Sequence, residues 1–366
     1  MEAYPQVFAG SHRVTESLVA ELPARGWRAR VVLPADGVAA ERFRDAGVRV
    51  EVVPAPPALL RYQGASLRGR PAVQAAAAIP AYWRRLGDVL RTADVVHALD
   101  PRGLLLAGPA ARVARRPLVW QLHTTSRWAA VNALGSVLAH EVVVVSASSR
   151  RAMPGLRGRV VVEEPPVTEV VRDLPVTVPG LDPLVATVAR AHQNKGLDVL
   201  VEAVAHLSDR WPALRVVVIG ADPSDGGEVT RDLAARIGGH GLGDRVTLAG
   251  WADRPTDAWA GAWAYVQPSR TGESYGMAVV EAMACSLPVV VTDVPGLCER
   301  VADGRDGMVV PPEDPVALAG AIDALLAEPD RARRMGDAGR RRVRDGRSVG
   351  DHADSWVRRY EALASP

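Results

Sequence analysis

Residues 269–293, SRTGESYGMAVVEAMACSLPVVVTD, contain a polar loop, an apolar helix, a turn and an apolar strand in close succession. Residues 277–285 are apolar on every side of the predicted helix except at Glu281. Pro288 stops the helix, and residues 289–291 form a fully apolar strand. Strands that are apolar on both faces are typical of a parallel sheet covered by helices on both sides, so this stretch predicts an α/β fold.

Two carboxylates in this stretch, Glu273 and Glu281, stand eight positions apart, a little over two helical turns. The free N–H groups and the dipole of the helix start attract phosphate. The element therefore offers phosphate donors beside acids that can accept sugar hydroxyls. A buried helix with one stray glutamate is the alternative, although an unpaired buried acid is costly.

The same alternation of strands and helices runs through the whole chain. The expected strands are residues 28–33, 48–53, 94–97, 118–122, 141–145, 184–188, 215–219, 246–248 and 264–266. The expected helices are residues 15–25, 72–91, 103–114, 131–138, 196–211, 228–238, 256–263, 317–326, 330–344 and 351–363. This order predicts two Rossmann-like domains with parallel sheets, whose ligands bind at the carboxyl ends of the strands.

Five prolines between residues 163 and 183 predict a linker between the two domains. We expect an N-terminal Rossmann-like domain over residues 1–165, a linker over 166–183 and a second Rossmann-like domain over 184–349. The last helix, residues 350–366, is expected to return to the first domain.

Composition narrows the class of protein further. The 366 residues suffice for two domains, and no apolar run reaches the roughly 18 residues of a membrane helix. The two cysteines give no disulfide framework, and no His/Cys cluster has metal-ligand spacing. We expect a cytoplasmic protein without a signal peptide, a metal or a nucleic-acid partner.

The two halves differ in charge. Residues 1–170 hold 22 arginines and 14 acids, so 22 − 14 = +8, and residues 171–366 hold 22 basic residues and 28 acids, so 22 − 28 = −6. The basic half could attract an acidic acceptor or an anionic membrane surface; a solvated Arg-rich face is the alternative. Candidate contacts are Arg61, Arg68, Arg70, Arg84, Arg85 and Arg91.

A second candidate site contains two basic residues, Arg190 at the end of the strand VATVAR and Lys195 in the following KGLD. Lys195 is the only lysine among 44 basic residues. A compact ammonium at a strand-to-helix connection suits a phosphate site. Chance placement is the alternative.

The stretch ESYGMAVVEAMACSLPVVVTD resembles the E-x7-E region of retaining GT-B glycosyltransferases, specifically glycosyltransferase family 4. The resemblance continues through Pro295-Gly296, Glu299, Asp303-Gly304 and Gly307, and it is strong for the C-terminal half and weaker upstream. Ser286 departs from the glycine usual in the family. No Asp-x-Asp pair, the metal–nucleotide signature of the other large glycosyltransferase fold, occurs in the chain.

This resemblance implies two Rossmann-like domains facing across a cleft and a metal-independent, retaining transfer of sugar. The donor would be a nucleotide-diphosphate sugar, with no further cofactor. The acceptor would be a hydroxyl of a small molecule, a natural-product scaffold or a lipid. A non-hydrolysing sugar-nucleotide epimerase and a non-catalytic partner protein are the alternatives. A nicotinamide oxidoreductase lacks its G-x-G-x-x-G after a strand.

The resemblance also assigns roles in the second domain. Arg190 and Lys195 would neutralise the leaving diphosphate, a charge effect that is usually the largest catalytic term. Glu281 would accept both ribose hydroxyls, and Glu273 would contact the transferred sugar near its 3-hydroxyl. Backbone N–H groups would come from Gly276 and Met277. The base would lie near Gly220, Gly250 and Trp251, although Trp251 suits packing equally well.

In the first domain, only Gly10 remains of the family's Gly-Gly loop, which lets backbone approach the donor phosphate. His123 matches a family histidine near the reacting centre; a satisfied strand-end histidine is the alternative, and for His97 we favour a structural role. Glu163-Glu164-Pro165-Pro166 stands where the family has N-G-V-D.

The family's first strand precedes the Gly loop, and here Met1-Glu2-Ala3 is followed at once by Tyr4-Pro5. We therefore expect the central strand to be missing and a longer native start upstream.

Overall fold

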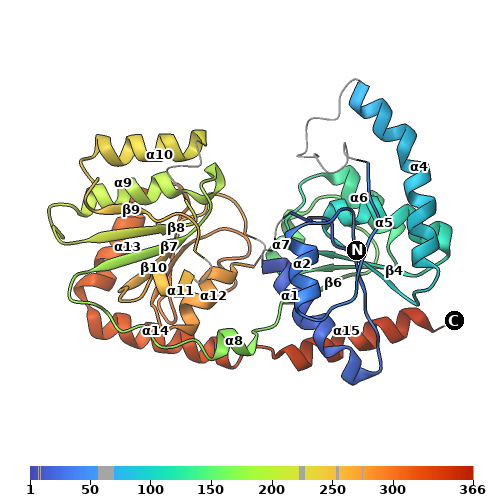
Figure 1. Ribbon diagram of the computed structural model, residues 1–366. Coiled ribbons are helices and arrows are strands. Elements are labelled where there is room, and N and C mark those ends of the chain that lie inside the picture. The colour runs from blue at the N-terminus through green and yellow to red at the C-terminus, as the bar shows by residue number, and fades with distance from the viewer. Residues whose placement is uncertain are drawn as a thin grey trace. The chain divides into compact units, whose positions relative to one another are not determined.

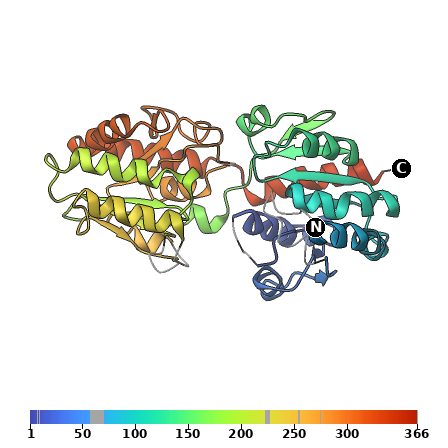
Figure 2. The same ribbon diagram turned by 90° about the horizontal axis from the view of Figure 1, so that it is seen from above.

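The computed structural model describes residues 1–6, 8, 10–56, 70–221, 227–252, 255–273 and 275–365. It divides into two compact units. Unit 1 comprises Met1–Pro166 and Arg347–Pro366, and unit 2 comprises Val167–Gly346. Each unit has strands at its centre and helices around them (Figures 1 and 2).

Unit 2 contains a sheet of six parallel strands in the order β12-β11-β10-β7-β8-β9. They are β7 (Leu184–Val188), β8 (Arg215–Ile219), β9 (Val246–Leu248), β10 (Ala264–Gln267), β11 (Val289–Thr292) and β12 (Met308–Val310). Counted along the unit, this is the Rossmann order 3-2-1-4-5-6, which reverses between β7 and β10. The expected parallel α/β arrangement is confirmed, and the reversal marks where such sheets bind ligands.

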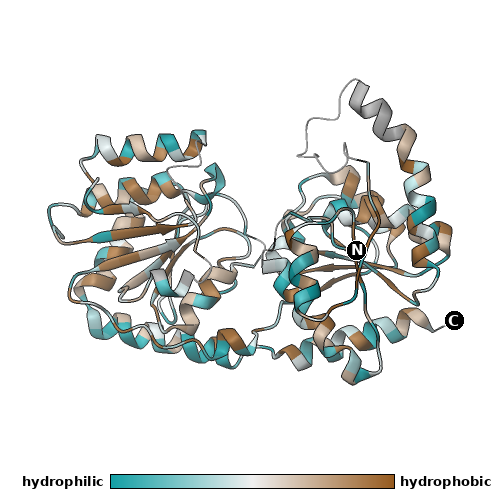
Figure 3. Ribbon diagram, in the orientation of Figure 1, coloured by the Kyte–Doolittle hydropathy of each residue, from teal (hydrophilic) through white to brown (hydrophobic). Residues whose placement is uncertain are grey.

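The helices of unit 2 cover both faces of this sheet. They are α8 (Glu169–Arg172), the 3-10 turn η2 (Gln193–Lys195), α9 (Leu197–Leu207), α10 (Glu228–Gly239), α11 (Pro255–Ala258), α12 (Met277–Ala284), α13 (Pro315–Ala327) and α14 (Pro329–Arg344). Helices α9, α10 and α13 pack with the strands in one core, to which Val218, Leu233 and Ile322 contribute. Figure 3 shows hydrophobic strands along the middle of the unit.

Part of the expected linker is held to unit 2 by its backbone. Thr177 N donates to Cys285 O at 2.8 Å, and Gly180 N donates to Gly261 O at 2.9 Å. The segment before β7 thereby packs along the edge from which the strands start.

Unit 1 contains four parallel strands in the order β3-β4-β5-β6 and a parallel pair β1-β2. They are β1 (Val31–Leu33), β2 (Val50–Val52), β3 (Val96–Leu99), β4 (Leu118–Leu122), β5 (Glu141–Val144) and β6 (Val160–Val162). Its helices are α1 (Gly10–Glu21), η1 (Pro23–Arg25), α2 (Val38–Asp45), α4 (Arg70–Leu90), α5 (Asp100–Ala114), α6 (Ala129–Leu138), α7 (Ala147–Ala152) and α15 (Val349–Ala364).

The first residues of the chain join the two groups of strands. Glu2 N donates to Val32 O of β1 at 3.0 Å, and Leu99 N of β3 donates to Met1 O at 3.1 Å. Met1 N also donates to His97 O at 2.6 Å. The expectation that the central strand is missing is therefore wrong for these backbone groups, because Met1 bonds to β3 and Glu2 bonds to β1.

Alternate residues of β4 point into two different cores. Leu118, Trp120 and Leu122 belong to a cluster with side chains of α4 and α5. Val119 belongs to another cluster with Leu18 of α1 and with α15. The unit 1 sheet is therefore covered by helices on both faces, as its largely apolar strands predict.

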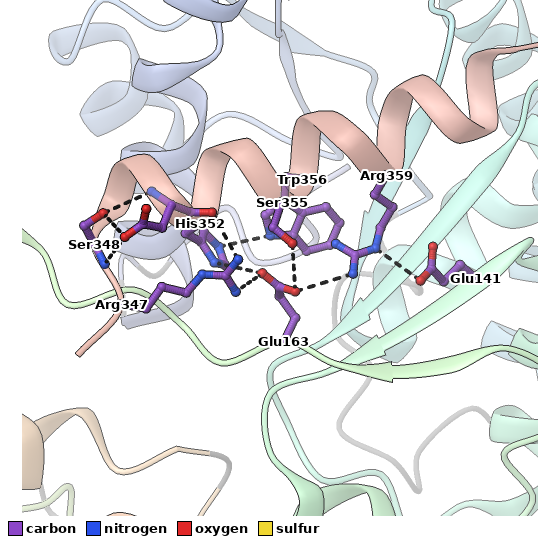
Figure 4. A network of polar contacts seen from close by, with 9 residues as sticks. Glu141, Glu163, Arg347, Ser348, His352, Ser355, Trp356 and Arg359 are labelled. Atoms are coloured by element: carbon purple, nitrogen blue, oxygen red, sulfur yellow. Dashed lines mark hydrogen bonds and ion pairs between the residues drawn. The ribbon is translucent and has the colours of Figure 1, made fainter. Parts of the chain in front are cut away.

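Helix α15 returns to unit 1, as expected, and Glu163 is its main polar anchor (Figure 4). This buried carboxylate is contacted by Arg347, by His352 Nδ1 at 3.4 Å, by Ser355 Oγ at 3.2 Å and by Arg359 Nη2 at 3.4 Å. Arg359 Nε also lies 3.2 Å from Glu141 Oε1. The glutamate that replaces the family's N-G-V-D loop thus fastens the C-terminal helix.

Over the described ranges of the chain, none of the helices combines the length and the apolar character needed to cross a bilayer.

Candidate functional site

The loops that follow β7 and β10 meet at the reversal point of the unit 2 sheet. Lys195, from the first loop, forms an ion pair with Glu273, from the second, and both side chains are partly exposed. Gly196 has a positive φ of 62°, and a Cβ there would lie 2.0 Å from Pro268 O. Only glycine permits the two loops to approach so closely, and this approach brings the Lys195 ammonium and the Glu273 carboxylate together.

Arg270 ties the same two loops together a second time. Its guanidinium donates hydrogen bonds to both carboxylate oxygens of Asp198 at the start of α9, and the bond from Nη1 to Oδ1 is 2.7 Å long. Its backbone N donates to Asn194 O at 2.8 Å. Burial alone would raise the pKa of Asp198, but the Arg270 contact lowers it. The carboxylate is therefore held ionised, and the loop that carries Lys195 is fixed.

A series of side-chain hydrogen bonds connects Tyr265 of β10 to Glu273. Tyr265 OH donates to Gln267 Oε1 at 2.7 Å, and Gln267 Nε2 donates to Ser269 Oγ at 3.1 Å. Ser269 Oγ then donates to Glu273 Oε1 at 2.7 Å. Burial raises the pKa of Tyr265, so its hydroxyl keeps its proton.

The two ends of this chain set its direction. Val188 N can only donate to Tyr265 OH, at 3.4 Å, and the Glu273 carboxylate can only accept. Every proton between them therefore points toward Glu273. Ser269 and Lys195 both contact Oε1 of Glu273, and within the described ranges no residue bonds its Oε2.

The start of α12 lies in the same loop region. Gly276, with φ 82°, precedes Met277, the first residue of the helix, and a Cβ on Gly276 would lie 2.7 Å from Leu297. The first N–H groups of a helix have no partner within it, so Met277 N is free of intrahelical bonds. Half-buried Glu281 lies one turn further on. Burial is the main cause of the raised pKa of Tyr265, and the negative charges of Glu281 and Glu273 add to it.

The remaining candidates of unit 2 lie on the same edge. Exposed Arg190 follows β7, and no side chain in the described ranges pairs with it. Gly220, with φ 95°, and Gly250, with φ 69°, follow β8 and β9, and Gly250 N donates to Ala221 O at 2.9 Å. Trp251 is 72% exposed, so packing does not account for it.

In unit 1, His123 follows β4 and is buried. Neither ring nitrogen has a hydrogen-bond partner among the described residues. Burial lowers its pKa, and the nearby Asp100 carboxylate opposes that shift. Asp100 Oδ1 accepts from His123 N at 2.9 Å and from Thr124 N at 3.0 Å, which fixes the turn. The alternative of a satisfied strand-end histidine does not fit these unpartnered nitrogens.

The other unit 1 candidates divide by role. His97 stacks on Trp356 at 4.4 Å and its Nδ1 lies 2.9 Å from Tyr360 OH, so the structural interpretation holds. Gly10 is the first residue of α1. His12, two positions later in the same helix, is buried, and burial lowers the pKa of its ring.

Sequence reasoning did not identify Arg270, Ser269 or Gln267 as parts of the site. The sequence offered one indication of these residues, which is that the apolar strand AYVQ ends in a glutamine, Gln267. Across the described ranges, no three His, Cys, Asp or Glu side chains gather as metal ligands would. The edge of unit 2 thus combines the cations Arg190 and Lys195, helix N–H groups and two carboxylates, a set that can bind a diphosphate and sugar hydroxyls.

Comparison with known proteins agrees with this chemistry. Residues 176–342 match the family described as Glycosyl transferases group 1, and residues 9–170 match the Glycosyl transferase 4-like domain. The chain is 30% identical over 362 residues to the phosphatidyl-myo-inositol mannosyltransferase of Mycobacterium leprae, a match that covers 93% of this chain and 90% of that protein.

A D-inositol 3-phosphate glycosyltransferase of Jonesia denitrificans is 34% identical over 170 residues, 45% of this chain and 40% of that protein. The chain thus spans less than half the length of that relative. The crystal structure of Anabaena Alr3699/HepE in complex with UDP and glucose superimposes with a TM-score of 0.82 at 21% identity, and 99% of each chain is covered.

Proposed function

The chain belongs to the family 4 glycosyltransferases with the GT-B fold, and from this premise we propose that it moves a sugar from a nucleotide-diphosphate sugar to a hydroxyl acceptor. The transfer retains the anomeric configuration and requires no metal. The observation that carries the proposal is the Lys195–Glu273 ion pair at the reversal point of the unit 2 sheet, beside the start of α12.

Each residue of this edge has a role in donor binding. Lys195 and Arg190 take the diphosphate, together with the backbone N–H groups at Gly276 and Met277. Lys195 then exchanges its bond to Glu273 for one to phosphate oxygen. Glu273 remains held by Ser269 and accepts a sugar hydroxyl at Oε2. This exchange couples diphosphate binding to sugar binding.

The nucleoside would lie further along the same edge. Glu281, one turn into α12, accepts the two ribose hydroxyls. Gly220 and Gly250 leave room for the base beside exposed Trp251. A carboxylate that holds a diol makes charge-assisted bonds, which are roughly twice as strong as neutral ones.

The reaction balances without a dedicated enzymic base. The acceptor oxygen forms a bond to the anomeric carbon on the face that the diphosphate leaves. The bond from that carbon to the phosphate oxygen breaks, and its electron pair stays on the phosphate. That phosphate oxygen takes the acceptor's proton. Lys195 and Arg190 stabilise the charge that builds there, which is where preorganised cations contribute most.

In unit 1, His123 serves the acceptor, because its backbone is fixed by Asp100 and its ring nitrogens have no bond among the described residues. The acceptor is a hydroxyl of a polyol or of a lipid head group, the types named for the relatives that act on inositol phosphate and phosphatidylinositol.

A thermal-shift panel of nucleoside diphosphates tests the donor half of this proposal. A ligand at about 100 times its dissociation constant adds about 2.7 kcal/mol to stability. The matching sugar nucleotides are then incubated with polyol and lipid acceptors in chelator, and the anomeric configuration of the product is read by NMR. An inverted product, or transfer that needs added metal, would contradict the retaining, metal-independent scheme.

A further inference from the structure

Helix α6 of unit 1 buries its polar Asn132 and exposes the apolar Leu134 and Val137, while Leu138 at its end packs against the core. Asn132 and Gly135 are its buried positions, and Asn132 Nδ2 donates to Ser126 O at 3.0 Å and to Pro154 O at 2.8 Å. On the opposite side, Leu134 is 44% exposed and Val137 66% exposed. A surface helix normally has the reverse arrangement.

The inward face is fixed by close packing. A Cβ on Gly135 would lie 2.1 Å from the Trp120 ring, so this face cannot turn away from the sheet. Ser136 Oγ donates to Asn132 O and accepts from Arg157 N, both at 2.9 Å. The helix therefore cannot rotate to bury Leu134 and Val137 within unit 1.

The apolar face continues beyond α6. Trp128, the residue before the helix, is 44% exposed, and Val113 at the end of α5 is 59% exposed. Arg112 donates to Val137 O, which places the end of α5 beside the end of α6. Single exposed apolar residues are ordinary, but four of them on and next to one helix indicate an interaction surface.

Three exposed arginines lie next to this face, and the stretch of sequence that contains them has few acids. Residues 101–162 contain nine arginines and one acid, Glu141, which is buried and pairs with Arg359. Arg112, Arg127 and Arg157 are exposed next to α6. An apolar stripe with flanking arginines matches an anionic lipid surface, to which each nearby arginine adds about 1 kcal/mol, a factor of about five.

We propose that α6 is a membrane-surface element, which lies in the plane of an anionic lipid interface through Trp128, Leu134 and Val137 with the arginines against the head groups. Its ten residues are too short to span a hydrocarbon core of about 30 Å. A second copy of the chain is a poorer occupant, since a twofold contact would bring the same arginines together across the interface.

This surface also connects to catalysis, a point that rests on the proposed function. Asn132 bonds Ser126 O in the loop that follows His123, so the start of α6 is fixed to the loop of the acceptor histidine. A lipid acceptor whose head group lies at the interface would be presented on the side of unit 1 that carries His123.

Vesicle sedimentation of the whole chain tests the proposal. Vesicles of phosphatidylcholine alone are compared with vesicles of equal parts phosphatidylcholine and phosphatidylglycerol, at low and raised salt. We expect binding to the anionic vesicles only, weakened by salt. Leu134→Gln with Val137→Gln should lower the partition constant at least tenfold, and Arg127→Gln with Arg157→Gln about 25-fold at low salt, five for each arginine.

Val316→Gln is the matched control, because Val316 on α13 of unit 2 is also 66% exposed. It should bind vesicles like the natural chain. The nucleoside diphosphate thermal shift should be unchanged in all variants, which separates this proposal from the donor site. No binding to anionic vesicles overturns the proposal. So does a concentration-dependent dimer that the Leu134/Val137 variant abolishes without any lipid binding.

Discussion

Replacing Ser269 with alanine tests the hydrogen-bonded chain that supports Glu273. The change removes the 2.7 Å bond from Ser269 Oγ to Glu273 Oε1 and leaves buried Gln267 Nε2 without its acceptor. Hydrogen bonds to charged groups contribute about 1.5–3 kcal/mol. Since 1.4 kcal/mol is about a factor of ten, loss of this bond predicts a roughly 10- to 100-fold loss in sugar-nucleotide affinity or in turnover.

The loss should depend on the sugar. Without Ser269, Lys195 is the remaining anchor of Glu273, so diphosphate binding and Glu273 positioning compete for one ammonium. Calorimetry should therefore show a larger effect on the sugar nucleotide than on the nucleoside diphosphate alone. Turnover with donor saturating should fall as well.

Ser355→Ala is the matched control, because Ser355 Oγ also donates to a carboxylate, that of Glu163 in unit 1, at 3.2 Å. Both variants should lose about 1–3 kcal/mol of unfolding free energy. Only Ser269→Ala should lose donor affinity. Equal donor affinity and turnover in the two variants would refute the positioning role of the chain.

Further predictions concern the site and the fold. Lys195→Met should lower turnover with little loss of stability, and Lys195→Arg should rescue it only in part, since the guanidinium is larger and planar; near-normal rates in the Met variant would contradict the phosphate role. Glu281→Gln should weaken nucleotide binding by about 1.5–3 kcal/mol in calorimetry with the fold intact. Ser286→Gly should raise the unfolding free energy by about 1 kcal/mol in urea, because Ser286 holds a φ of 59°. Glu163→Gln should cost about 3 kcal/mol. Burial alone would raise the pKa of Glu163, but its contacts with His352 and the arginines lower it below 4.5. The ionised carboxylate therefore stabilises the fold fully above pH 4.5, and this stabilisation is lost as the pH falls below that value. If the unfolding free energy of the variant fell with acid just as it does in the natural chain, this assignment would be contradicted.

The strongest predictions from sequence were the buried strands. Residues 118–122, 184–188, 215–219 and 246–248 form strands with the predicted bounds, because a short, largely apolar run between polar turns has few other placements. The short elements α2, α7, β6 and β12 were not predicted. Met308–Val310 of β12 is three residues long, and pairing with β11 is what makes it a strand.

The features that the sequence did not predict depend on contacts between residues far apart in the chain. The bonds of residues 1–3 to β1 and β3 join positions about 30 and 97 apart, which no local pattern reports. The site residues Lys195 and Glu273 could be assigned through the family resemblance, whereas the direction of Ser269 depends on the turn after β10. Arg61 and Arg68 lie outside the described residues, as does the side chain of Arg70. Arg84, Arg85 and Arg91 are exposed on or next to α4.

A crystal structure of the chain with a bound nucleoside diphosphate tests the central claim most directly. We predict phosphate oxygens within hydrogen-bond distance of Lys195 Nζ and Met277 N, with the ribose hydroxyls on Glu281 and the Lys195–Glu273 pair opened. A nucleotide bound away from the β7–β10 edge, or one that leaves Lys195 on Glu273 and contacts neither Met277 nor Glu281, would contradict the account.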